Sequence, residues 1–176
     1  MLENHKQLGA DISVATIPVA QREAPEFGIL KSSEGLITSF IEKPKKDVLE
    51  DWVSDTGEEM KDAGRNYLAS MGIYIFNRKL LFDLLRDEYK DATDFGKEII
   101  PQSINKYKVA SYQYTGYWTD IGNIYSFFEA NLDLTKDIPD FNMFDSDRTI
   151  YTRPRMLPPA KISGTTLEKT LIAEGS

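Results

Sequence analysis

The segment FIEKP at residues 40–44 places two charged residues where an apolar strand meets a turn. Pro44 ends the strand pairing, so Glu42 and Lys43 come at the strand end, where ligands bind in open α/β sheets. A lysine there can neutralise a phosphate, and a glutamate can accept hydrogen bonds from sugar hydroxyls. On spacing alone, two ordinary surface charges are the more frequent explanation.

A second segment, GYWTDIG at residues 116–122, sets one acid between glycines and aromatic residues. A carboxylate on such a tight turn, here Asp120, can be a Mg²⁺ ligand beside transferring phosphates. The more common role for a turn aspartate is a hydrogen bond to its own backbone.

Two further positions, Ser70 and Gly28, have two explanations each, and a third, Asp94, has a structural one. Ser70 lies in an apolar strand and needs a hydrogen-bond partner, which is either backbone or a ligand. Gly28 permits close approach of a ligand to the backbone, or only a turn. Asp94 suits a helix N-terminus, and we assign it no catalytic role.

The elements that must position these residues follow from apolar periodicity and turn residues. The order predicts an α/β fold. We expect a helix end over 2–8, a strand covered on both faces at 11–19, and a hairpin of 27–32 with 36–42. A charged surface excursion with one short helix is expected at 44–65, and then a buried strand at 67–76, in which Gly72 indicates a bulge or a close backbone approach. Helices are expected at 78–87 and 94–106, with a break or a new helix start at Pro101, followed by a strand at 109–114 and a helix capped by Asn123.

Composition excludes several kinds of chemistry. The 176 residues carry 21 basic and 28 acidic side chains, a net charge of −7, which disfavours binding to nucleic acid or an anionic membrane. The chain has no cysteine, and its single histidine, His5, makes histidine-based catalysis or metal binding unexpected. No apolar run approaches the ~20 residues of a membrane span, and the N-terminus is no secretory signal. We therefore expect a cytoplasmic protein without nucleic-acid or membrane partners.

Several motifs, in this order and spacing, resemble the glucose-1-phosphate adenylyltransferase family, the ADP-glucose pyrophosphorylases of glycogen and starch synthesis. They are EFGILK around Gly28, FIEKP at 40–44, LASMGIYIF at 68–76, DFGKEIIP at 94–101, YWTDIG at 117–122 and LPPAKI at 157–162. FIEKP and W-x-D-x-G recur across sugar nucleotidyltransferases, whereas LASMGIY, DFGKEIIP and LPPAKI are more specific to the ADP-glucose branch. Thr119 and Asn123 depart from residues common in that branch, without removing a group that the mechanism needs.

The resemblance implies an α/β fold: a partial Rossmann-like (GT-A-like) nucleotidyltransferase domain with a mixed sheet, followed by the beginning of a left-handed parallel β-helix. Residues 1–135 would form the C-terminal, sugar-phosphate-binding half of that domain, 136–161 a linker, and 162–176 the start of the β-helix. The glycines are widely spaced, so the chain holds no Gly-rich phosphate loop. The expectation is therefore a fragment that is inactive alone.

The resemblance also implies roles for the site residues. Lys43 would bind the phosphate of glucose 1-phosphate, Glu42 and Gly28 would hold sugar hydroxyls, Ser70 would add a hydrogen bond to the sugar, and Trp118 would shape its pocket.

The implied reaction transfers a nucleotide from ATP to glucose 1-phosphate, with Asp120 as a catalytic residue and as one of two carboxylates on Mg²⁺. The family is allosterically regulated, and the resemblance implies a homotetramer at full length. Two alternatives stay open: another sugar-1-phosphate nucleotidyltransferase that uses UTP, dTTP or GTP, and a non-catalytic regulatory paralogue.

Overall fold

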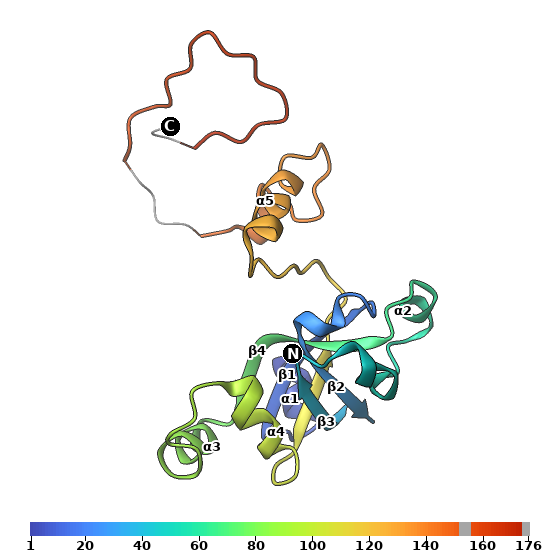
Figure 1. Ribbon diagram of the computed structural model, residues 1–176. Helices are drawn as coiled ribbons and strands as arrows, with labels where there is room; N and C mark the ends of the chain where they lie inside the picture. Colours follow the sequence, from blue (N-terminus) through green and yellow to red (C-terminus); the bar gives the residue numbers. More distant parts are fainter. Residues whose placement is uncertain (152–155, 174–176) are drawn as a thin grey trace. The chain divides into compact units, whose positions relative to one another are not determined.

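The computed structural model describes residues 1–151 and 156–173, which fall into two compact units. The first is Met1–Thr115 and the second is Gly116–Ser176. Figure 1 shows the strands gathered in the first unit, with α3 and α4 on one side of them and α2 on the other. The domain boundaries expected at 135 and 161 stay a prediction.

A five-stranded mixed sheet forms the centre of the first unit. Its strands are β1 (Ile12–Val19), β2 (Gly28–Ser33), β3 (Leu36–Glu42), β4 (Tyr67–Phe76) and β5 (Val109–Gln113), in the order β1-β4-β2-β3-β5. Strand β1 pairs parallel with β5 and antiparallel with β4, so the predicted α/β class with a mixed sheet is confirmed. Closure into a barrel, through pairing of Leu36 with Ala110, was not predicted.

Strand β1 is the central strand, as predicted. All eight of its residues are buried, because β4 and β5 pair with its two edges and apolar side chains cover both faces. Ile12 and Val14 lie in the core with residues from the helices, including Leu84, Ile99 and Ile100.

The predicted hairpin is formed by β2 and β3. Glu34 and Gly35 both have positive φ, 51° and 79°, which suits a tight two-residue hairpin loop. The resulting register places Gly28 directly opposite Glu42. This pairing brings two of the predicted site residues together.

Strand β4 differs in part from its prediction. Only its first three residues are buried, whereas the rest is half-buried or exposed, because the chain bulges there. Ser70 pairs with Thr16 and Tyr74 with Val14, so three residues of β4 stand opposite one residue of β1. Gly72, with φ of 71°, supplies the left-handed backbone that the predicted bulge requires.

The helices of the first unit are short. They comprise α1 (Leu2–Gln7), α2 (Glu58–Asp62), α3 (Arg78–Asp83) and α4 (Ile100–Ser103), with 3₁₀ turns at Ala24–Glu26 and Lys46–Trp52 and π-helical turns at Leu84–Glu88 and Phe95–Ile99. The predicted break at Pro101 falls where a π-helical turn gives way to α4, since proline cannot donate the helical hydrogen bond.

The second unit contains α5 (Ile124–Asp133) and a 3₁₀ turn at Ser146–Arg148. The predicted cap at Asn123 is confirmed, because its Oδ1 accepts a hydrogen bond from the Ser126 amide at 2.9 Å. The β-helix is not confirmed: residues 162–173 contain no strand, and 174–176 lie outside the described residues.

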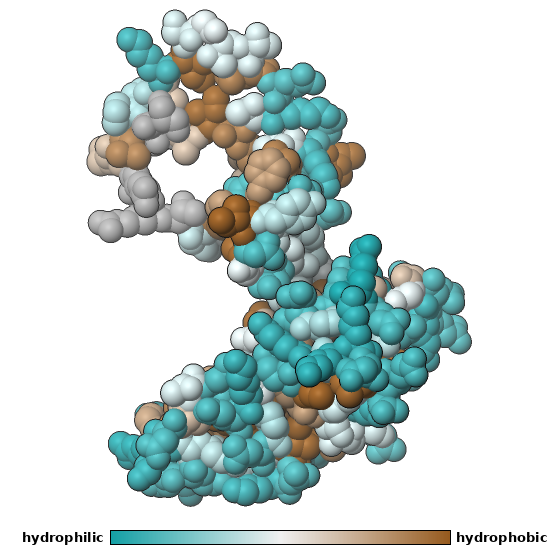
Figure 2. All heavy atoms as spheres, viewed as in Figure 1, coloured by the Kyte–Doolittle hydropathy of each residue, from teal (hydrophilic) through white to brown (hydrophobic). Residues whose placement is uncertain are grey.

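Many apolar side chains of this second unit are exposed, including Ile124 and Phe128 on α5, and Figure 2 shows brown side chains at its surface. None of the described helices is long and apolar enough to cross a membrane.

Candidate functional site

The β2–β3 hairpin builds one wall of the candidate site. Gly28 is buried, and a Cβ atom on it would lie 2.5 Å from Phe40 Cζ and 2.7 Å from Glu42 Oε2. Both distances are far below van der Waals contact. The missing side chain of Gly28 therefore makes room for the Phe40 ring and the Glu42 carboxylate.

The Glu42 carboxylate reaches the loop that begins the next helical segment. A Cβ atom on Gly96 would lie 3.2 Å from Glu42 Oε2, 3.4 Å from Asp94 Oδ1 and 3.8 Å from the Tyr74 hydroxyl. Three oxygen atoms from three separate elements therefore surround the bare α-carbon of Gly96. This cluster of Glu42, Asp94 and Tyr74 around Gly96 is called the carboxylate cluster below.

The electrostatics agree with this proximity. Burial raises the pKa of Glu42 above its ordinary value, and the charge of Asp94 raises it further. Lys43 and Lys97 act in the opposite direction, because a positive charge favours the ionised carboxylate. Glu42 is thus a partly desolvated acceptor with both signs of charge beside it.

Tyr74 connects Ser70 to the carboxylate cluster. Burial raises the pKa of the Tyr74 hydroxyl, the charges of Glu42 and Asp94 raise it too, and a hydrogen bond with the Ser70 side chain lowers it. The ring is stacked on Phe95, with centroids 5.8 Å apart. Ser70 Oγ also accepts a hydrogen bond from the Gly72 amide at 3.3 Å, so the bulge of β4 helps to place it.

Asp94 is held by its own helix. Its Oδ1 accepts a hydrogen bond from the Lys97 amide at 2.9 Å, which is the helix-start role expected from the sequence. The preceding Thr93 amide donates to Glu98 Oε2 at 2.7 Å. These two bonds fix the loop, so Asp94 is both a helix cap and a member of the carboxylate cluster.

Lys43 follows Glu42 in an unusual backbone conformation. Its φ is 45°, in the left-handed region, and its amide donates to Phe27 O at 3.0 Å. Pro44 after it is buried, whereas Lys43 is exposed. A lysine held in this region is strained, and such strain is common at functional sites.

Trp118 and Asp120 belong to the second unit. Trp118 is half-buried and Asp120 is exposed, with its Oδ2 3.0 Å from the position of a Cβ on Gly122. Across residues 1–151 and 156–173, no three His, Cys, Asp or Glu residues gather as metal ligands. Asp120 alone would supply one carboxylate to Mg²⁺, and its predicted role stays a prediction.

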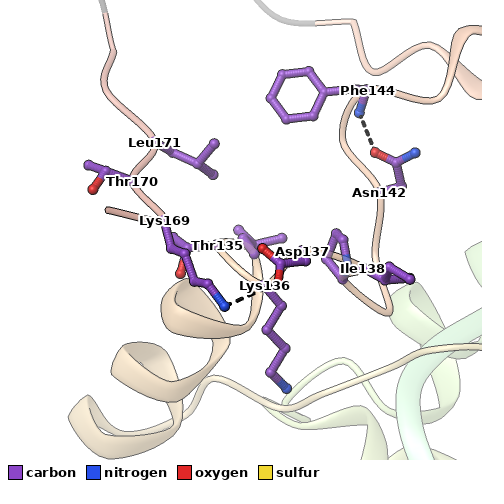
Figure 3. A pocket seen from close by; sticks show the side chains of 11 residues that line it. Thr135, Lys136, Asp137, Ile138, Asn142, Phe144, Lys169, Thr170 and Leu171 are labelled. Atoms are coloured by element: carbon purple, nitrogen blue, oxygen red, sulfur yellow. Dashed lines mark hydrogen bonds and ion pairs between the residues drawn. The ribbon is translucent and has the colours of Figure 1, made fainter. Parts of the chain in front are cut away.

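A cavity of about 430 Å³ in the second unit was not anticipated from the sequence (Figure 3). Residues 134–139, Asn142, Phe144 and residues 169–171 line it. Lys169 pairs with Asp137 at 3.1 Å, and Lys136 pairs with Asp133. Within the described residues, each lysine that lines the cavity is paired with an acid, so we assign the cavity no anionic ligand.

The sequence analysis selected Gly28, Glu42, Lys43 and Ser70. The structure places them in or beside the carboxylate cluster, and their roles in binding stay predictions. The sequence analysis missed Tyr74 and Gly96, and it gave Asp94 a capping role only. Tyr74 follows Ser70 by four residues, a spacing that puts both on one face of a regular strand. That spacing was the one available signal, and the bulge between the two residues obscures it.

A comparison with protein families shows the family of the chain. The family model for nucleotidyl transferase matches residues 1–137, which is most of the chain. The chain therefore belongs to the nucleotidyl transferase family, and its mixed α/β sheet is consistent with a nucleotidyltransferase fold.

Proposed function

We propose that this protein is a glucose-1-phosphate adenylyltransferase and that the carboxylate cluster binds the sugar of glucose 1-phosphate. The nucleotidyl transferase family supports transfer of a nucleotide to a sugar phosphate. The choice of ATP as the nucleotide and of glucose 1-phosphate as the sugar phosphate rests on motifs that resemble the ADP-glucose branch, namely LASMGIY, DFGKEIIP and LPPAKI. The same resemblance supports a Rossmann-like (GT-A-like) domain with a left-handed β-helix after it, and a homotetramer at full length. The composition supports a cytoplasmic location.

The observation that carries the proposal is the convergence of hydrogen-bond acceptors beside a lysine. Glu42 and Asp94 approach Gly96 together with the Tyr74 hydroxyl, and Ser70 is bonded to Tyr74. Ionised carboxylates only accept hydrogen bonds, so this cluster suits a ligand with several hydroxyl donors. The exposed ammonium group of Lys43, beside Glu42, suits the phosphate of the same ligand.

The proposed chemistry is a single displacement at phosphorus. An oxygen of the sugar phosphate attacks the α-phosphorus of ATP, a new P–O bond forms, the bond between the α-phosphorus and the bridging oxygen breaks, and pyrophosphate leaves. Such transfer needs alignment and charge neutralisation more than covalent assistance. Glu42, Asp94 and Ser70 orient the sugar, while Lys43 holds its phosphate.

We further propose that Asp120 supplies one carboxylate to Mg²⁺, which would neutralise charge on the transferring phosphates. The tight turn and the exposed carboxylate fit a metal ligand. Trp118 is proposed to shape the sugar pocket.

The first test is a titration of the ¹⁵N-labelled chain with glucose 1-phosphate, followed by amide chemical shifts. We expect saturable shifts at Glu42, Lys43 and Ser70, and much weaker ones in Lys43→Ala. Gln102→Ala, an exposed change on α4, is the matched control. A wild-type chain without these shifts would refute the sugar-phosphate site.

The second test determines which nucleoside triphosphate the protein uses. A product assay on the protein as its gene encodes it, with ATP, UTP, dTTP and GTP in parallel, is expected to yield ADP-glucose. Preference for another triphosphate would favour a different sugar nucleotidyltransferase. Absence of every product, with sugar-phosphate binding intact, would favour a regulatory paralogue.

A further inference from the structure

Two glycines from different elements face the same carboxylate oxygen. Glu42 Oε2 is 2.7 Å from the position of a Cβ on Gly28 and 3.2 Å from that on Gly96. Gly28 is the cross-strand partner of Glu42 in the hairpin, whereas Gly96 lies in the turn Phe95–Ile99. The carboxylate therefore occupies a narrow slot between two bare α-carbons.

Backbone conformation does not explain the glycine at position 96. Its φ is not positive, in contrast to Gly72 and Gly35, so an alanine could adopt the same backbone. Within a helical turn, glycine is about 1 kcal/mol less favourable than alanine. Local structure thus favours alanine, and the space above the α-carbon is the remaining physical reason for glycine.

That space lies between the acceptors of the carboxylate cluster. A methyl group on Gly96 would stand 3.4 Å from Asp94 Oδ1 and 3.2 Å from Glu42 Oε2. It would displace the Glu42 carboxylate by a few tenths of an ångström and cover the gap between the two acids. A hydroxyl donor could then no longer reach both acceptors.

We propose that Gly96 is a positioning residue for the sugar: with Gly28 it bounds the slot that orients the Glu42 carboxylate toward a sugar hydroxyl. This inference rests on the proposed function, since it assigns the slot to sugar-phosphate recognition. Gly28 cannot test it alone, because a side chain there would also collide with Phe40, which packs against the core. At Gly96 the three nearest atoms are all polar oxygens of the cluster.

The experiment is a double-mutant cycle between Gly96→Ala and Glu42→Asp. The affinity of each variant for glucose 1-phosphate is measured by calorimetry. Shortening Glu42 by one methylene withdraws its carboxylate from the new methyl by about 1.5 Å. We expect Gly96→Ala to weaken binding about tenfold, which is the low end of what one hydrogen bond to a charged group contributes. Glu42→Asp weakens it too, and the double variant should be no weaker than Glu42→Asp within about twofold.

Thermal unfolding distinguishes a loss of affinity from a loss of stability. The melting temperature of Gly96→Ala should equal or exceed that of wild type, and Gln102→Ala should leave both affinity and melting unchanged. Additive losses in the double variant, or full affinity in Gly96→Ala, would overturn the inference and leave the proposed function intact. A misfolded Gly96→Ala that Glu42→Asp does not restore would overturn it as well. Absence of glucose 1-phosphate binding in wild type would instead refute the proposed function, and with it this role of Gly96.

Discussion

Lys43 has a strained backbone and a proposed contact with the phosphate. Substitutions at Lys43 can therefore test the effect of the strain on stability and the effect of the charge on binding separately. Its φ of 45° costs an L-residue about 1–2 kcal/mol, and Pro44 restricts the backbone further. Glycine avoids this cost but loses about 0.5–1 kcal/mol through its freedom in the unfolded chain. We therefore expect Lys43→Gly to be more stable than Lys43→Ala by about 1 kcal/mol.

The two variants form a matched pair, because both remove the ammonium group and only one removes the strain. Chemical denaturation should give the difference in unfolding free energy, and thermal melting a difference of about 4 °C for a domain of this size. Both variants should lose affinity for glucose 1-phosphate by about ten- to a hundredfold, the range for a charged hydrogen bond. Their affinities should agree with each other within about twofold.

Either half of this expectation can fail independently. If Lys43→Ala proves as stable as Lys43→Gly, the left-handed backbone carries no strain. If Lys43→Ala binds glucose 1-phosphate like wild type, its ammonium group does not contact the phosphate. A large difference in affinity between the two variants would mean that backbone shape at this turn, and not the charge, governs binding.

Three other changes test separate parts of the molecule. The pKa of Glu42 is raised, so the folded chain binds that proton more tightly than the unfolded chain, and ionisation at higher pH destabilises the fold. Urea titrations should therefore show Glu42→Gln more stable than wild type at pH 7, with the difference shrinking as the pH falls toward 4.5; a pH-independent difference would contradict the raised pKa. In a product assay on the protein as its gene encodes it, Asp120→Asn should lower kcat more than it changes KM, because Mg²⁺ stabilises charge that develops in the transition state; a wild-type kcat would remove Asp120 from the site. Asn123→Ala should destabilise α5 by about 1 kcal/mol in circular-dichroism melts, whereas Asn123→Asp keeps the acceptor and should melt as wild type does.

Local signals located most elements correctly. Four features depend on residues close together in the chain: the mostly apolar stretch of β1, the turn between β2 and β3, the glycine of the β4 bulge and the Asn123 cap. Each can be recognised from periodicity, turn chemistry or capping alone. The burial of β4 was overestimated, because its last seven residues are only half-buried or exposed.

The candidate site was predicted only in part, because local signals do not show which distant residues come together. FIEKP indicates a strand end, so Glu42 and Lys43 could be selected from their own neighbourhood. Asp94 has an adequate local role as a helix cap, and that role concealed its proximity to Glu42. Nothing near Gly96 in the sequence shows that a carboxylate from β3 lies above it.

The amino-acid sequence by itself determined where strands, turns and caps form, and the motifs by which the nucleotidyl transferase family is recognised. Only the tertiary structure decided that β3 and β5 close the barrel and that Glu42, Asp94 and Tyr74 meet around one bare glycine. The physical reason is range: backbone conformation follows from neighbouring residues, whereas a gap a few ångströms wide depends on how separate elements pack.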